Sequence, residues 1–226
     1  YQTSPADLQH LMTAPDLTVY IAEQCEQILG AMLVCEEGNL PEELSAHRRV
    51  KGHLVPQLLR QHTGIHDLIG LQSQRVLRLA VHPQARRQGI ASQLVRYWQQ
   101  HTPSLDFRSA SFGITQDLYH FWRQLGFQSM HIGAKRDKAS GTHNILMVRS
   151  QHPELSKVKQ HFKQQLPHSL METLTDLPPG LVMELLAENA TSTASDATLQ
   201  AVQAYAKAQR PYESVSQALW QWTIDN

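Results

Sequence analysis

The stretch "LRLAVHPQARRQGIASQLV" (residues 77–95) constrains the fold more than any other part of the sequence. It opens with an apolar run typical of a buried strand, and the run ends near Pro83, which lacks the N–H that a strand ladder needs. From Gly89 onward the apolar side chains recur at helical spacing, so that Ile90 and Trp98 share one face. The chain therefore passes directly from a strand into an amphipathic helix, which predicts helices packed on a sheet.

The junction between this strand and this helix gathers polar and charged side chains. Arg86, Arg87 and Gln88 lie immediately before Gly89. The first amides of a helix have no partner within it, and the helix dipole places partial positive charge there. Gly89 lets an anion approach the backbone, and Ala91 keeps the next turn small. We predict a pyrophosphate-binding site; the alternative is an ordinary glycine turn with solvated arginines.

A second strand–helix unit follows. Residues 105–113 are predicted to form a strand, and residues 115–125 a helix that Thr115 caps and Gly126 ends. The other elements are assigned from alternation, helical spacing and capping residues. Further strands are expected at 17–24, 27–38, 75–82, 127–135 and 142–150, and further helices in "TSPADLQHLM", from Pro41–Glu43 and around Pro56.

The pattern changes after Ser150. Residues 1–150 alternate strands and helices over a normal domain length, whereas residues 151–226 carry helical spacing only. We therefore expect an α/β domain at 1–150 and a helical C-terminal tail at 151–226.

Composition sets limits on the setting of the protein. The 20 basic residues balance the 20 acidic ones, so net charge indicates neither a nucleic acid nor a membrane. Cys25 and Cys35 do not form a disulfide framework, which favours a reducing, cytoplasmic setting. No apolar run is long enough to span a bilayer, and no secretory signal opens the chain. Because the sequence begins at Tyr1, we expect a piece of a longer protein.

Histidine is frequent, with 13 residues, and adds positive charge below neutral pH. His62 and His66 have the i, i+4 spacing of helical metal ligands. Gly64 between them and the lack of a third ligand argue against a metal, and we expect none.

Particular residues resemble those of a known family. Arg86, Gly89 and Ala91 match the R/Q-x-x-G-x-G/A pyrophosphate motif of the GCN5-related N-acetyltransferase (GNAT) superfamily, and "FWRQLGF" (121–127) resembles its later helix-to-strand element. Several blocks also resemble, in order, the acetyltransferase module of the bacterial tRNA(Met) cytidine acetyltransferase family. They are "TSPADLQHLMTAP", "RRVKGHLVPQLLRQH", "RLAVHPQARRQGIASQLV", "SASFGITQDLYHFWRQLGFQSMHIG" and "ASGTHNILMV".

The resemblance implies an α/β GNAT fold over roughly residues 1–150, a mixed and largely antiparallel sheet with a bulged, splayed central strand pair. It implies acetyl transfer from acetyl-CoA to the N4 amine of the wobble cytidine of elongator tRNA(Met), in the cytoplasm and without a membrane. The family uses ATP and Mg in a helicase-like ATPase module upstream. Since this chain has no G-x-x-x-x-G-K-[S/T], it is expected to be the C-terminal part of such an enzyme.

The same resemblance assigns the acetyl-CoA contacts. The backbone of Leu79, Ala80 and Val81 would meet the pantetheine arm, and one amide there would polarise the thioester carbonyl. Arg123 would reach the phosphates or lie on the surface. The pyrophosphate would be held by Arg86, Arg87, Gln88, Gly89, Ile90, Ala91 and Ser92.

The sequence constrains the catalytic acid and the catalytic base less than the acetyl-CoA contacts. Asp117 is a candidate at the start of a helix, where its charge also suits the helix dipole. Many superfamily members place a tyrosine acid where this chain has Trp122, whose indole does not serve. Tyr119 would substitute or simply pack, and His82 near the cleft is a further candidate with a structural alternative.

Three basic segments would supply RNA contacts, although such segments are usually solvated. They are "HRRVKGH" with Arg48, Arg49 and Lys51; "KRDK" with Lys135, Arg136 and Lys138; and "KVKQHFK". Two other functions stay open: a GNAT enzyme acting on a protein or small amine, and a non-catalytic RNA-binding module that keeps acetyl-CoA as a structural ligand.

Overall fold

The structure is a computed structural model that describes residues 9, 16–41, 52–102, 104–138, 140–189 and 196–225. The chain divides into two compact units, Tyr1–Gln165 and Leu166–Asn226, each described by itself. The helices expected in "TSPADLQHLM" and from Pro41–Glu43 lie almost wholly outside the described residues, as do Arg48, Arg49 and Lys51.

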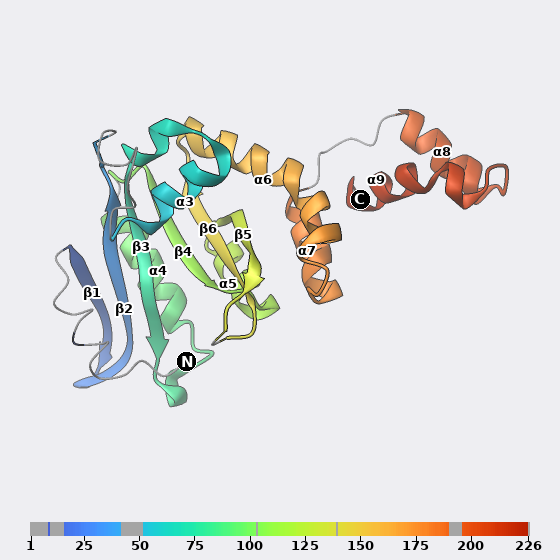
Figure 1. Ribbon diagram of the computed structural model, residues 1–226. Coiled ribbons are helices and arrows are strands. Elements are labelled where there is room, and N and C mark those ends of the chain that lie inside the picture. The colour runs from blue at the N-terminus through green and yellow to red at the C-terminus, as the bar shows by residue number, and fades with distance from the viewer. Residues whose placement is uncertain are drawn as a thin grey trace. The chain divides into compact units, whose positions relative to one another are not determined.

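The first unit is built on a six-stranded sheet of order β1-β2-β3-β4-β6-β5 (Figure 1). Only β3 and β4 pair in parallel, and every other neighbouring pair is antiparallel. The predicted mixed, largely antiparallel sheet is therefore confirmed. The strands are β1 (Leu17–Gln24), β2 (Gln27–Gly38), β3 (Gln72–Val81), β4 (Phe107–Gly113), β5 (Gln128–Arg136) and β6 (His143–Ser150).

The turn between β1 and β2 follows from its local backbone, whereas the start of β3 is set by tertiary contacts. Cys25 and Glu26 join β1 to β2 with φ of 49° and 65°, the left-handed pair that a two-residue hairpin requires. β3 begins at Gln72 and not at residue 75, because Gln72 pairs with Gly38 and its amide donates to Asp106 Oδ2 at 2.8 Å. These tertiary contacts draw a polar segment into the strand, against its loop-like composition.

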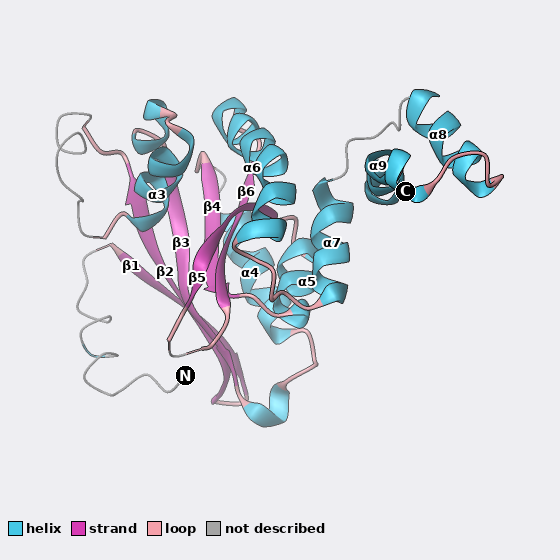
Figure 2. Ribbon diagram, turned by 45° about the vertical axis from the view of Figure 1, so that its right-hand side comes forward, coloured by secondary structure: helices cyan, strands magenta, loops and turns pink. Residues whose placement is uncertain are grey.

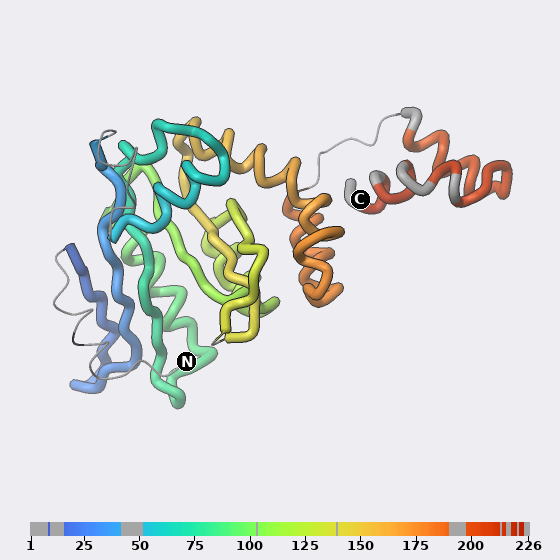
Figure 3. Tube along the Cα trace, in the orientation of Figure 1, coloured from blue at the N-terminus to red at the C-terminus, as the bar shows by residue number. Residues whose placement is uncertain are grey.

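The central strands separate after a short parallel ladder. β3 and β4 pair only from Ser73 with Phe107 to Val76 with Ala110. Directly after this ladder, β3 bulges at Leu77, because the register against β2 skips that residue. The two strands then diverge, as the trace in Figure 3 shows. The expected bulged and splayed strand pair is confirmed.

Helices cover both faces of the sheet (Figure 2). On one face, α3 (Leu54–Thr63) and the first turns of α6 (Pro153–Glu172) share a core with Phe107. On the other lie α4 (Ile90–His101) and α5 (Gln116–Gln124). Because side chains alternate along a strand, the residue after Phe107, Arg108, points toward α4. Short 3₁₀ turns, η1 (His66–Ile69) and η2 (Pro83–Ala85), complete the unit.

The second unit is helical in its described residues. It holds the end of α6, then α7 (Pro179–Asn189), α8 (Asp196–Ala206), η3 (Tyr212–Ser214) and α9 (Ser216–Asp225). The boundary between the two units along the chain falls inside α6, after Gln165, because the first turns of that helix pack into the core of the first unit. Division into domains at residue 150 stays a prediction. Among the described helices, none combines the length and apolarity needed to cross a bilayer.

Candidate active site

The turn between β3 and α4 has a fixed backbone shape. The His82 amide donates to Leu29 O at 2.8 Å, which ties the end of β3 to β2. η2 then turns the chain with Ala85 buried beneath it. Arg87 and Gly89 adopt left-handed φ values of 62° and 81°. A non-glycine residue in that region carries a cost of about 1 kcal/mol, so the backbone at Arg87 is held there by its surroundings.

These dihedral angles leave a row of amides exposed at the start of α4. Gln93 is the first residue of the helix whose amide donates into it, to Gly89 O at 2.9 Å. Among the described residues, no backbone carbonyl accepts from the amides of Arg87–Ser92. No side chain caps the helix. The predicted anion site therefore has the donors that an anion needs.

Two arginines rim this row of amides. Arg86 Nε donates to Val81 O at 3.4 Å, which folds the side chain over the end of β3. Arg87 Nη2 lies 3.5 Å from Asp117 Oδ2 at the start of α5. The side chains of Arg87 and Asp117 are 90% and 84% exposed, so water screens the pair and leaves the arginine available to a ligand.

Beyond their short parallel ladder the two central strands continue without pairing to each other. The unpaired segments are Leu77–Val81 of β3 and Ser111–Gly113 of β4. At the end of β4, a Cβ on Gly113 would stand 2.4 Å from Thr142 Oγ1. The glycine therefore lets the turn after β5 pack against the end of β4.

The family model "GNAT acetyltransferase 2" matches residues 1–103 and 90–152. The chain belongs to that family. Its first unit has the GNAT fold, with the splayed strands and the glycine-started helix in the order that the family motif requires.

Several relatives of this chain carry the name tRNA(Met) cytidine acetyltransferase TmcA. The protein of Vibrio cholerae is 36% identical over 232 residues, which cover 99% of this chain and 32% of that protein. That of Nitrosococcus halophilus is 34% identical over 82% of this chain and 26% of its own length. That of Yersinia pestis is 32% identical over 97% and 32%. This GNAT chain thus spans at most 32% of the length of these relatives.

Solved structures include similar folds. The polyamine N acetyltransferase of Drosophila melanogaster matches with a TM-score of 0.49 and 17% identity, over 66% of this chain and 82% of that one.

The predicted catalytic residues of this GNAT chain fall in three different environments. Asp117 faces Arg87 near the start of α4 and lies in the first turn of α5, whose N-cap is Thr115. Tyr119 is fully buried, and Trp122 beside it is 4% exposed. Burial of both side chains favours packing over acid catalysis. His82 is exposed at the end of β3.

The other predicted ligand-binding residues lie on the surface or beside the core. Arg123 stacks over the Tyr119 ring at 5.7 Å, on α5. Lys135, Arg136 and Lys138 are exposed at the end of β5 and in the following turn. Asp137 orders that turn, because its Oδ1 accepts from Ser140 N at 2.9 Å. The basic turn therefore lies at the end of β4 where the strands diverge.

Two groups of charged residues escaped the sequence reasoning. Buried Glu37 accepts from Arg75 Nε at 2.6 Å and from Val55 N at 2.9 Å, which joins β2, β3 and the start of α3. Arg108 and Arg149 gather at the far end of α4 from Gly89. An arginine inside each of the predicted strand segments "DFRSAS" and "LMVRS" is the sequence signal that could have predicted this arginine pair.

Cysteine and histidine do not extend the site. Burial raises the pKa of the Cys35 thiol to about 11, against the opposing charge of Arg75, so this thiol is a poor nucleophile at neutral pH. His62 stacks on His131 with ring centroids 4.0 Å apart, while Arg60 contacts His66. Within the described residues, no group of three or more His, Cys, Asp or Glu could hold a metal.

Proposed function

We propose that this chain is the acetyltransferase part of an enzyme that moves an acetyl group from acetyl-CoA to the N4 amine of the wobble cytidine of elongator tRNA(Met). One observation carries the proposal: β3 and β4 separate beyond Val76 and Ala110, and β3 leads through η2 to a helix start whose amides have no backbone partner among the described residues. A thioester arm suits the first feature and a pyrophosphate the second. The names of the relatives support tRNA as the acceptor.

The residues at the helix start fit acetyl-CoA, which supplies the acyl group in activated form. A Cβ built on Gly89 meets no atom within 4 Å, so a phosphate has an open approach to the amides of Arg87–Ser92. Exposed Arg86 and Arg87 add full charges at the rim. Further along, the backbone of Leu79–Val81 would hold the pantetheine arm. An amide in that segment would donate to the thioester carbonyl oxygen as negative charge develops there.

The acceptor amine determines what else the chain must do. The N4 amine of cytidine is neutral at pH 7, but its lone pair is delocalised into the ring. It therefore needs accurate positioning during formation of the N–C bond, and loss of a proton afterwards. Of the predicted catalytic side chains, exposed His82 directly after Val81 suits this proton transfer best, because Asp117 faces Arg87 and Tyr119 is buried.

Departure of the sulfur needs no strong acid. The C–S bond breaks as the carbonyl re-forms, and a thiol with an ordinary pKa of about 8.5 leaves readily as the thiolate. This requirement suits a chain whose family tyrosine position holds buried Trp122.

The working enzyme would include more than this chain. We expect an upstream helicase-like ATPase part that uses ATP and Mg, since the chain spans 32% of its Vibrio cholerae relative. The tRNA would reach the cleft past the basic turn of Lys135, Arg136 and Lys138, in the cytoplasm. Arg48, Arg49 and Lys51 stay predicted RNA contacts.

The test uses the full-length enzyme with acetyl-CoA, ATP and unmodified tRNA. The RNA is then digested to nucleosides and analysed by mass spectrometry. We expect N4-acetylcytidine from elongator tRNA(Met), and none from the same tRNA with uridine at the wobble position.

Each alternative function has its own signature in this assay. Acetylated protein or small amine without N4-acetylcytidine would replace the proposal by a different GNAT substrate. Acetyl-CoA binding without transfer to any acceptor would indicate a non-catalytic module.

A further inference from the structure

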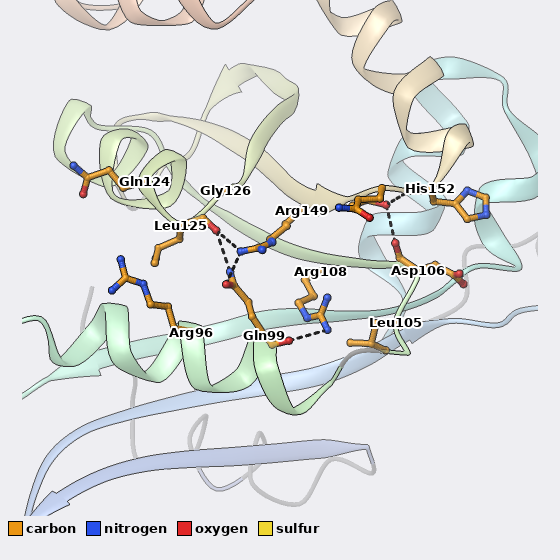
Figure 4. A pocket seen from close by; sticks show the side chains of 12 residues that line it. Arg96, Gln99, Leu105, Asp106, Arg108, Gln124, Leu125, Gly126, Arg149 and His152 are labelled. Carbon is orange, nitrogen blue, oxygen red and sulfur yellow. Dashed lines mark hydrogen bonds between the residues drawn. The ribbon is translucent and has the colours of Figure 1, made fainter.

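We infer that an open cavity between α4, β4 and β6 binds a phosphate group of the RNA substrate, at the end of α4 opposite Gly89. This inference rests on the proposed function for the identity of the RNA. The cavity has a volume of about 700 Å³, and arginines from three elements, Arg96, Arg108 and Arg149, line it (Figure 4).

Arg108 is the fixed part of this cavity. The residue is 9% exposed, and its guanidinium carbon lies 6.0 Å from the centre of the buried Trp98 ring. Its Nε donates to Thr102 Oγ1 at 3.0 Å, and its Nη2 donates to Gln99 O at 3.4 Å. Nη1 has no partner among the described residues. A charge that is held this firmly and still has spare donors is preorganised for an anion.

Arg149 reaches the same cavity from β6. Its Nη1 donates to Gln99 Oε1 at 2.6 Å and to Leu125 O at 2.9 Å, at the C-terminal end of α5. Gly126 gives this guanidinium its space, because a Cβ there would stand 3.3 Å from Arg149 Nη1. Nε and Nη2 of Arg149 are left for a ligand in the described structure.

The balance of charge in the cavity is positive. Arg96 is exposed and has no hydrogen-bond or ion-pair partner among the described residues. Asp106 is the one acidic lining residue, and its Oδ2 accepts from the Gln72 amide at 2.8 Å. In Figure 4 this carboxylate points away from Arg108. No carboxylate of the described residues lies within ion-pair distance of the three guanidinium groups.

The electrostatics of Arg108 favour an anion at this position. Burial lowers the pKa of Arg108, and the nearby charge of Arg149 lowers it further, against a smaller opposing effect from Tyr20. Arg108 is nearly buried and Arg149 is exposed, yet their like charges repel each other, and an anion between them removes that repulsion.

The chemistry of the lining favours a phosphodiester over other anions. Three guanidinium groups from different directions suit a tetrahedral group with several oxygens better than a planar carboxylate. Apart from Leu105, Leu125 and Gly126, every lining residue is polar, which disfavours an apolar peptide. The volume is that of sites which hold whole small molecules, so a phosphate leaves room for the groups attached to it.

The test measures binding of unmodified elongator tRNA to the full-length enzyme over a series of KCl concentrations. Arg96→Gln and Arg149→Gln each remove one charge from the cavity, and Arg96→Lys restores a charge. We expect about a fivefold loss of tRNA affinity for each Gln variant, with the log K against log salt slope reduced by about 0.7 to 0.9, and near-normal binding for Arg96→Lys. Acetyl-CoA affinity should stay within twofold of the wild type.

The control is Arg60→Gln, which removes a charge of the same kind from α3, outside the cavity. It should leave both the affinity and the salt slope unchanged. Thermal unfolding of each variant separates lost binding from lost structure, because Arg149 also holds the end of α5.

Two results would overturn the inference. Unchanged tRNA affinity and salt slope in both Gln variants would exclude an RNA phosphate in this cavity. Loss of inorganic phosphate binding with unchanged tRNA binding would assign the cavity to a free anion instead. A wild-type enzyme that binds tRNA through these arginines but makes no N4-acetylcytidine would refute the proposed function and leave the cavity assignment standing.

Discussion

At the N-terminal end of α4, the amides of Arg87–Ser92 have no backbone partner in the part of the chain that the structure describes, whereas at its C-terminal end the carbonyl of Gln99 faces the arginine-lined cavity. The first end attracts an anion through its own backbone, since the helix dipole is positive there. The second end would repel one. It becomes positive only because Arg108 and Arg149 cover the terminal carbonyls of α4 and α5 and still keep spare donors.

The contrast shows which interactions each proposed anion site depends on. The N-terminal site needs a glycine and a turn, all within a few consecutive residues. The C-terminal site needs buried packing, because Arg108 lies on Trp98, and Trp98 Nε1 donates to buried Gln74 Oε1 at 2.6 Å. Changes of the backbone should therefore affect the first site most, and changes of packing the second.

The largest effect is expected for Gly89→Glu. The side chain places bulk and negative charge where the pyrophosphate should bind, so acetyl-CoA affinity should fall by at least about 100-fold, or about 2.7 kcal/mol. Isothermal titration calorimetry with acetyl-CoA measures this.

Gly64→Glu is the matched control for that variant. Gly64 has a similar φ of 74° and also no atom within 4 Å of an added Cβ, but it ends α3. It should cost similar stability and leave acetyl-CoA binding intact. Equal loss of binding in both variants would refute the placement of the cofactor site.

A smaller effect is expected from Gly126→Ala, after the end of α5, where the glycine lines the arginine-lined cavity. Gly126 has φ of 83°, where an L-residue costs about 1 to 2 kcal/mol, and the new Cβ would also press on Arg149. Urea unfolding should show a greater loss of stability than for Gly64→Ala, which carries the φ cost alone. If the two losses of stability are equal, the Arg149 side chain moves aside without an energetic cost, and the arginine positions in the cavity are not rigidly held.

Lowering the pH is expected to reduce the folding stability of the protein while the arginines of both sites keep their charge. Burial, with a smaller contribution from the charge of His62, lowers the pKa of His131 to about 4. Burial also lowers the pKa of His62, and the charge of His161 adds to this. As the pH falls below about 6.5, the unfolded chain binds more protons than the folded one, so stability declines until the folded histidines titrate.

The decline should not exceed about 1.4 kcal/mol per pH unit for each histidine. Denaturant unfolding between pH 7 and pH 5 tests it, and His131→Gln should flatten the dependence. A wild-type stability that stays constant over this range would contradict the role given to the His62–His131 pair.

The smallest effect is expected for Asp117→Asn. Because the carboxylate faces Arg87 in solvent, its loss should change the turnover rate by no more than about threefold and slightly lower the KM for acetyl-CoA, through reduced repulsion of the phosphates. Steady-state kinetics of the full-length enzyme measure both quantities. If turnover instead slowed by about 100-fold or more, Asp117 would be the catalytic base.

Element boundaries can be predicted from the sequence where contiguous residues dictate the backbone. Pro83 and Gly89 mark the passage from β3 to α4, Thr115 caps α5, and Gly126 ends it, so these boundaries were predicted within a residue or two. Prediction from the sequence failed at Gln72, where pairing with β2 and the Asp106 carboxylate override a polar composition. It also left open the environment of Tyr119, since helical spacing alone does not tell a cleft wall from a core position.

By itself, then, the sequence determined the strand–turn–helix unit and the predicted anion site at the start of α4, because a helix start exposes its amides whatever surrounds it. Only the tertiary structure decided the second arginine cluster. Arg149 is distant in the chain from Arg96 and Arg108, and the three line one cavity because the sheet order sets β6 beside β4 and alternation turns Arg108 toward α4. Local hydrogen bonding can be derived from neighbouring residues, whereas convergence of distant side chains depends on which strands pair.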